Sequence, residues 1–178
     1  IDVDPWMLNP LFVRFGAMNF NLAEETDRLA SAVGSLLSKI RKRYREYGIK
    51  ETPFVVIKSD AGTNGKGIMM VKDAKEVRNM NQAQRDAMNS AMRCIHTADV
   101  VLQEGVHSFE RINEAVAEPV VYMMDRYVVG GFYRVHAERG ISENLNAPGA
   151  HYVPLAFAQQ HTLPDVQAKP GTMAPNRF

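Results

Sequence analysis

The strongest hydrophobic pattern of the chain lies between residues 21 and 48. Apolar residues recur there at steps of three and four, the spacing of one helix face, at Leu29, Val33, Leu36, Leu37, Ile40, Tyr44 and Tyr47. Asn21 followed by Glu24 predicts a capping box at the helix start, and Gly48 predicts its end. The pattern therefore predicts one long amphipathic helix.

Runs of apolar and β-branched residues predict the strands. Residues 54–57 and 68–71 flank a glycine-rich loop and predict a hairpin, and residues 99–106 predict a buried strand that leads into a turn. Residues 120–135 predict a second antiparallel hairpin, because two β-rich runs are joined there by a short polar turn. A pair of glycines in its second run indicates a bulge or a close backbone approach.

Two more helices and a tail complete the pattern. Asp73 with Glu76 predicts the capped start of a short helix. Residues 82–96 predict another helix, whose inward residues are Ala87, Met88, Ala91, Met92 and Ile95. From residue 159 onward, prolines and the lack of periodicity predict a loop or a mobile tail.

Composition and charge narrow the classes of protein. At 178 residues, 46% of them apolar, the chain is long enough for one good-sized domain or two small ones. Its formal net charge of +1 gives no reason to expect nucleic acid or an anionic membrane as a partner, and no apolar run approaches the ~20 residues that cross a bilayer. The single cysteine, Cys94, suits a reducing compartment such as the cytoplasm. Apolar helix faces fit a core or a subunit interface equally, so the sequence does not decide between a monomer and a homo-oligomer.

The segment around the first hairpin carries the clearest candidate chemistry. Lys58 ends an apolar run, and the loop after it contains Gly62, Thr63, Gly65, Lys66 and Gly67. Glycines let backbone N–H groups approach an anion and lysines add positive charge, so the segment fits the phosphates of a nucleotide triphosphate. Its spacing excludes a P-loop, a dinucleotide fingerprint and a kinase loop. An ordinary hairpin with a glycine turn is the alternative.

Three longer segments carry a family resemblance. They are Lys58-Ser59-Asp60-Ala61-Gly62-Thr63, Met124-Asp125-Arg126-Tyr127-Val128-Val129-Gly130-Gly131-Phe132-Tyr133-Arg134-Val135-His136 and Glu143-Asn144-Leu145-Asn146-Ala147-Pro148-Gly149. Together with residues 1–6 and 39–48, they make the chain resemble the bacterial glutamate–cysteine ligase family of the ATP-grasp type. The resemblance extends from the first residues to about Phe157.

This resemblance implies an α+β fold of the ATP-grasp, glutathione-synthetase-like type, in which the nucleotide is held between two α+β lobes. It assigns residues 1–49 to an irregular segment and the long helix, residues 50–106 to the small lobe with the glycine-rich loop, and residues 107–178 to part of the large lobe with a loop-like tail. Because the chain begins at Ile1, we also expect it to be the C-terminal part of a longer protein whose N-terminal region is absent here.

The resemblance also implies a reaction. It is the ATP-dependent joining of L-glutamate, through its γ-carboxylate, to L-cysteine by way of an acyl phosphate, the first step of glutathione biosynthesis. ATP and Mg²⁺ are the implied cofactors, and glutamate, cysteine and ATP are the implied small-molecule partners. An ATP-grasp ligase with other substrates, or a nucleotide-binding module without turnover, is the alternative.

Particular residues receive roles from the same resemblance. Lys58 reaches the phosphates of ATP, and the glycine-rich loop closes over the β- and γ-phosphates. The strand end with Gln103, Glu104 and Val106 supplies backbone groups that bind the adenine edge and a side chain that binds adenine or ribose. Arg134 holds the γ-phosphate or the acyl phosphate, because a guanidinium matches phosphate oxygens. An exposed strand arginine is the alternative for Arg134.

Magnesium needs hard oxygen ligands. The candidates are Glu118, Glu143, Asn144 and Asn146. The segment that contains the last three could instead be a substrate-facing loop, with Arg139, Asn144 and Asn146 as substrate residues, and both readings stay open. The five histidines show no metal-ligand spacing and are interpreted as structural.

Overall fold

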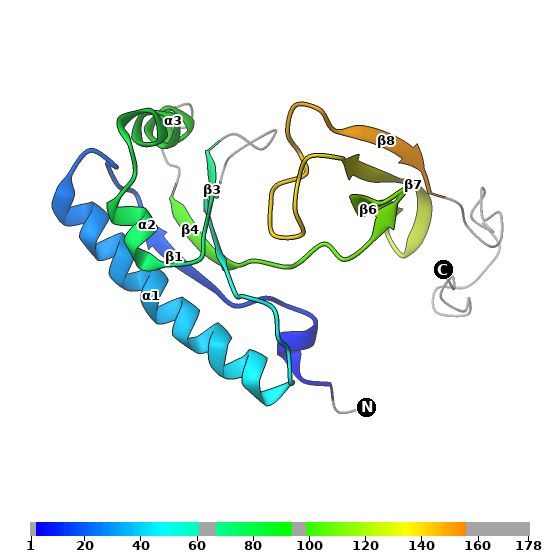
Figure 1. Ribbon diagram of the computed structural model, residues 1–178, viewed down its shortest axis with the longest axis horizontal. Coiled ribbons are helices and arrows are strands. Elements are labelled where there is room, and N and C mark those ends of the chain that lie inside the picture. Colours follow the sequence, from blue (N-terminus) through cyan, green and yellow to red (C-terminus); the bar gives the residue numbers. More distant parts are fainter. Residues whose placement is uncertain (1–2, 61–66, 94–98, 156–178) are drawn as a thin grey trace. The chain divides into compact units, whose positions relative to one another are not determined.

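The computed structural model describes residues 3–60, 67–93 and 99–155, and the chain divides into two compact units (Figure 1). The first unit is Ile1–His107 and the second is Ser108–Phe178. Within the described ranges, each unit contains one four-stranded antiparallel sheet, and the helices belong to the first unit. None of these helices combines the length and the apolar character that a membrane span requires.

The sheet of the first unit brings together strands that are far apart in the sequence. Its strands are β1 (Phe12–Gly16), β2 (Val55–Ser59), β3 (Ile68–Val71) and β4 (Val100–Glu104), in the order β1-β4-β2-β3. The pairing of β2 with β3 confirms the first predicted hairpin, in which Lys58 lies opposite Ile68. Strand β4 confirms the strand predicted within residues 99–106 and lies between β1 and β2, although only every second residue of it is buried.

Helix α1 (Ala23–Glu46) confirms the predicted amphipathic helix and packs against one face of this sheet (Figure 1). Six of the seven predicted apolar residues are buried, and the prediction is wrong for Tyr47, which is 42% exposed. The predicted capping box is also wrong, because the N-cap is Leu22 and makes no side-chain hydrogen bond. Gly48 ends the helix as predicted, with a φ of +68°.

The remaining helices are η1 (Pro5–Met7), α2 (Ala74–Arg78) and α3 (Gln82–Arg93). The predicted capping box of α2 is confirmed. The Asp73 side chain accepts from a backbone N–H of the first turn, and the Glu76 side chain accepts from the backbone N–H of Asp73. In α3, Met88 is buried as predicted, but Ala87 is exposed. The end of this predicted helix, Cys94 and the predicted tail lie outside the described residues.

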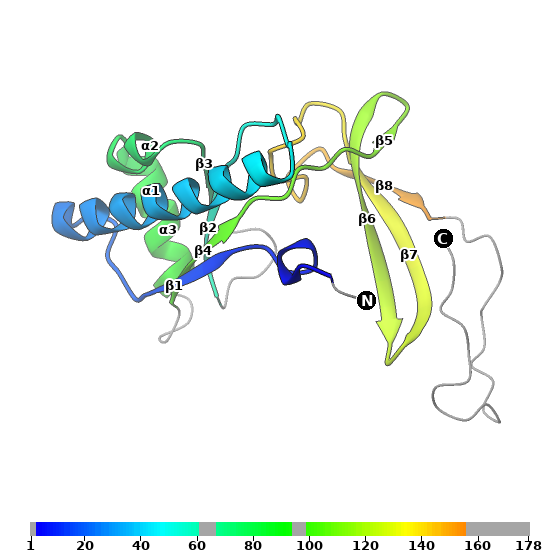
Figure 2. The ribbon, with the colours of Figure 1, turned by 90° about the horizontal axis from the view of Figure 1, so that it is seen from below.

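The sheet of the second unit is built around a long hairpin. Its strands, β5 (Arg111–Ile112), β6 (Ala115–Met124), β7 (Tyr127–His136) and β8 (His151–Pro154), follow in sequence order, each antiparallel to the next (Figure 2). Strands β6 and β7 confirm the second predicted hairpin. The register shifts by one residue between Tyr122 and Met123, and Val129 is the extra residue on β7. This bulge confirms the prediction made from the neighbouring glycine pair.

Candidate functional site

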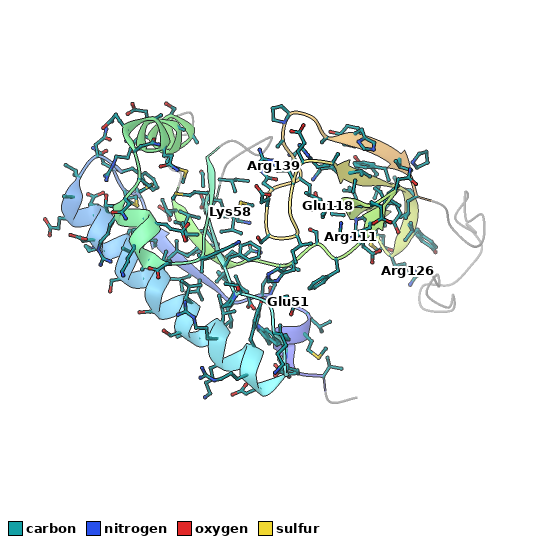
Figure 3. All side chains as sticks on the ribbon, viewed as in Figure 1. Glu51, Lys58, Arg111, Glu118, Arg126 and Arg139 are labelled. Atoms are coloured by element: carbon teal, nitrogen blue, oxygen red, sulfur yellow. The ribbon has the colours of Figure 1, made fainter. Side chains whose placement is uncertain are left out.

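Lys58 and Gln103 form a polar pair on the sheet of the first unit. Lys58 lies on β2 opposite Val101 of β4, and Gln103 follows two residues later on the same face. The Lys58 Nζ donates a hydrogen bond to Gln103 Oε1 at 2.6 Å, and both side chains are half-buried. The structure therefore brings together two of the predicted nucleotide-binding residues, and Figure 3 shows Lys58 on its strand.

These two side chains share the sheet face that points away from α1. Along β2 and β4, every second residue is buried, and the apolar ones pack with α1 in the core; they are Val55, Ile57, Val100 and Leu102. The residues between them point to the opposite face, because side chains alternate along a strand. Apolar side chains on that face include Val56, Ile68, Met70 and Val101, and β1 adds Phe12 and the charged Arg14. An apolar surface with a few fixed polar groups is typical of a site for a small molecule.

The carboxylate of Glu104 lies on the buried face and does not face Lys58. Its side chain is 4% exposed, and its Oε2 accepts hydrogen bonds from Trp6 Nε1 at 2.8 Å and from Leu11 N at 3.0 Å. Burial of a carboxylate is tolerated when hydrogen bonds satisfy it. Glu104 therefore anchors the N-terminal segment to β4. The side chain of Val106, beyond the strand end, is 70% exposed.

A second group of contacts holds the same N-terminal segment. Asp4 Oδ2 accepts hydrogen bonds from the Tyr47 hydroxyl at 2.7 Å and from Arg43 Nη1 at 3.2 Å. The bond from Tyr47, with a further bond from the Trp6 backbone, holds the pKa of Asp4 below its ordinary value of 3.8. The same Asp4–Tyr47 bond raises the pKa of Tyr47 above its ordinary value of 10.0. The segment is thus fixed to the C-terminal end of α1.

The glycine-rich loop is described only at its end. Gly62, Thr63, Gly65 and Lys66 lie outside the described residues. Gly67 has a φ of +66°, and a Cβ at this position would collide with the Cβ of Ala91 on α3. Both the backbone conformation and the close approach to α3 require glycine there. A phosphate-binding role for the loop stays a prediction.

Arg134 and Glu118 form a polar pair on the sheet of the second unit. They lie opposite each other on β7 and β6, and Arg134 Nη1 donates to the Glu118 carboxylate. The arginine side chain is 21% exposed, so Arg134 is not the exposed strand arginine of the alternative interpretation. Its Nε is buried and has no hydrogen-bond partner among the described residues. Because buried donors are rarely left unpaired, this Nε is expected to have a partner that the described residues do not supply.

The segment between β7 and β8 holds the other predicted residues. Arg139 Nη1 donates to Glu143 Oε1 at 3.1 Å, and the backbone N–H of Gly140 donates to Glu143 Oε2 at 2.6 Å. Asn146 N donates to Asn144 Oδ1 at 2.9 Å, and Leu145 between them is buried. Figure 3 shows Arg139 on this segment. The predicted substrate residues therefore lie in a loop with its own internal hydrogen bonds.

Two comparisons with known proteins bear on the family. The family model described as glutamate-cysteine ligase matches residues 1–178, the whole of the chain. The chain belongs to the glutamate-cysteine ligase family. A solved structure from Methylobacillus flagellatus KT, provisionally named a gamma-glutamylcysteine synthetase, is 52% identical to it, with a TM-score of 0.75. That match covers 98% of this chain and 41% of the solved chain, and none of the curated proteins matches.

The predicted magnesium carboxylates of this member of the glutamate-cysteine ligase family have arginine partners in the described part of the chain. Glu118 and Glu143 each have an arginine on the carboxylate. No three His, Cys, Asp or Glu side chains within residues 3–60, 67–93 and 99–155 lie together as metal ligands would. The assignment of Glu118, Glu143, Asn144 and Asn146 to Mg²⁺ therefore stays a prediction without geometric support.

Proposed function

We propose that this chain forms part of the catalytic site of an ATP-dependent glutamate–cysteine ligase with the ATP-grasp architecture. Membership of the family supports the reaction class. The observation that carries the proposal is the Lys58–Gln103 pair on an apolar sheet face, where the glycine-rich loop begins. In this reaction the γ-carboxylate of L-glutamate attacks the γ-phosphate of ATP and gives γ-glutamyl phosphate and ADP. The amine of L-cysteine then attacks the acyl carbon, and phosphate leaves.

This chemistry needs positive charge, because an anionic carboxylate must approach a triphosphate. Lys58 suits the need, since its partner Gln103 is a neutral amide and leaves the ammonium charge available to an anion. At an effective dielectric constant of about 20, two unit charges 4 Å apart attract each other by about 4 kcal/mol. We assign Lys58 to the phosphates of ATP on this ground.

The rest of the same sheet face suits adenosine. Val56, Met70 and Val101 offer apolar contacts to a purine ring beside Lys58. The amide of Gln103 has two N–H donors besides the oxygen that Lys58 occupies, so it can also bond to adenine or ribose. We assign the base to this surface, and Mg²⁺ is expected to accompany ATP.

Arg134 is assigned to the γ-phosphate or the acyl phosphate. Its contact with Glu118 fixes the guanidinium plane, and a fixed guanidinium matches phosphate oxygens with little reorganisation. The guanidinium is 21% exposed and has further N–H donors for such an oxygen besides the one that bonds to Glu118. Glu118 is then an orienting residue for Arg134 and not a metal ligand.

The substitution Lys58→Ala in the natural full-length protein tests the proposal. We expect it to abolish both ATP binding and ligation, whereas Lys75→Ala, which removes an exposed lysine of α2, leaves both unchanged. Calorimetric titration with ATP and an assay of released ADP measure the two steps separately. Normal ATP binding by Lys58→Ala would remove this lysine from the phosphate site. ATP binding by the unsubstituted protein, with no ADP released in the presence of both amino acids, would favour a module without turnover.

A further inference from the structure

His136 is a buried residue that the proposed reaction does not use. It is the last residue of β7 and lies two residues beyond Arg134, on the same face of the strand. Its side chain is 3% exposed. The Glu138 N–H donates to His136 Nδ1 at 3.3 Å, and His136 Nε2 lies 3.0 Å from Pro148 O. Since Nδ1 accepts a hydrogen bond, Nε2 is the ring nitrogen that donates to Pro148 O.

One imidazole ring therefore joins both ends of the segment between residues 138 and 148. Holding the two ends of a loop close together costs conformational entropy. The two hydrogen bonds of the ring form only when both ends are in place, so they offset this cost and favour one conformation of the loop. Leu145, in the middle of the segment, is 1% exposed and adds a buried apolar contact. Arg139, Asn144 and Asn146, which are the predicted substrate residues, all lie on this loop.

Gly149 gives an independent sign of the same contact. Its φ is +97°, in the region that favours glycine. A Cβ at this position would lie 3.2 Å from His136 Nε2 and 3.3 Å from its Cε1. The backbone conformation favours glycine where the loop returns to the histidine, and a Cβ there would press on the ring.

We propose that His136 is a positioning residue that holds the loop of residues 138–149 at both ends, and that it thereby orients the groups that bind an amino-acid substrate. The substrate part of this inference rests on the proposed function. The contact needs one acceptor and one donor on the same side chain. His136→Leu removes both, whereas His136→Gln keeps an amide with a donor and an acceptor.

Limited digestion of the natural full-length protein with trypsin tests the loop contact without any measure of activity. The peptide bond after Arg139 lies in the loop, and the bond after Arg126, in the β6–β7 turn, is an internal reference. We expect cleavage after Arg139 to become about tenfold faster in His136→Leu, because the loop opens locally, with a change of less than about twofold after Arg126. His151→Leu, at an exposed histidine of β8, is the matched control and should change neither rate.

Two further variants keep this test decisive. His136→Gln is expected to recover most of the protection of the bond after Arg139. If His136→Leu does not fold, Gly149→Ala is expected to give the same selective increase, because alanine is strained at a φ of +97° and its Cβ would lie 3.2 Å from the ring. Unchanged cleavage after Arg139 in the folded variants would overturn the loop contact.

Steady-state kinetics test the positioning role. We expect the KM for glutamate or for cysteine to rise about tenfold in His136→Leu and to recover in His136→Gln, with a change of less than about twofold in the KM for ATP. Faster cleavage after Arg139 with unchanged KM values for both amino acids would overturn the positioning role. If the unsubstituted protein forms no dipeptide, the proposed function fails, and the digestion still decides whether His136 holds the loop.

Discussion

Replacing Gln103 by glutamate is the most direct perturbation of the proposed ATP site. The neutral acceptor 2.6 Å from Lys58 Nζ becomes a carboxylate, so ATP must displace an ionic partner of the lysine. Because the pair is half-buried, we take about 1–2 kcal/mol for the added attraction, between the values of exposed and buried ion pairs. This difference raises the dissociation constant of ATP about 5- to 30-fold. Repulsion between the new carboxylate and the phosphates acts in the same direction.

Calorimetric titration of the natural full-length protein with ATP measures this constant. Gln84→Glu is the matched control, because it makes the same chemical change on α3, where Gln84 Oε1 accepts from Asn81 N at 2.9 Å. It should leave the constant within about twofold of its original value. An unchanged ATP constant in Gln103→Glu, in a protein that unfolds at the same urea concentration as before, would refute the assignment of Lys58 to the phosphates.

Two further predictions concern stability. Gly67→Ala is expected to lower the free energy of unfolding in urea by about 2–4 kcal/mol, because it adds a collision with α3 to the strain of a left-handed residue. Gly48→Ala, at a φ of +68° with open space around the added Cβ, should cost about 1–2 kcal/mol, and equal losses would contradict the packing of Gly67 on α3. The lowered pKa of Asp4 contributes stability that is present above pH 3.8 and is lost as the pH falls through the folded-state pKa. The raised pKa of Tyr47 contributes stability that is present below pH 10.0 and is lost as the pH rises through its folded-state pKa. Asp4→Asn should therefore weaken the fall of the urea midpoint at acid pH. An unaltered fall would show that the Asp4 contact does not cause it.

The long helix was predictable because its information is local. Spacings of three and four residues place the apolar side chains on one face whatever that face packs against, and six of the seven predicted residues of α1 are buried. The errors lie at the helix ends. Tyr47 follows the last helical residue and bonds to Asp4, which lies 43 residues away in the chain. The spacing of apolar residues along a helix cannot predict a contact with a residue so far away in the sequence.

The pairing of Arg134 with Glu118 depends on one extra residue. Counting back from the two-residue turn without a bulge would place Glu118 opposite Tyr133 and would send Arg134 to the other face. The bulge at Val129 shifts the register by one residue and makes the pair. The glycine pair predicted a bulge in this hairpin, but glycine composition alone does not give its position.

The roles of Glu104 and His136 could not be predicted from the sequence. Glu104 stands at a strand end, which suggests a ligand contact, but its carboxylate binds Trp6 at a separation of 98 residues. His136 shows no motif, and its contacts with Glu138 and Pro148 exist only once the loop has folded. Sequence patterns identify which segments form strands, whereas the partner of a buried polar group depends on the tertiary structure.

The formation of dipeptide from ATP, glutamate and cysteine tests the central claim most directly. Mass spectrometry of a reaction of the natural full-length protein with these three compounds and Mg²⁺, with each component omitted in turn, reads the nucleotide and the product together. We expect the mass of γ-glutamylcysteine with one ADP for each dipeptide, and loss of the dipeptide when either amino acid or ATP is left out. The absence of any dipeptide from the complete mixture would contradict glutamate–cysteine ligation.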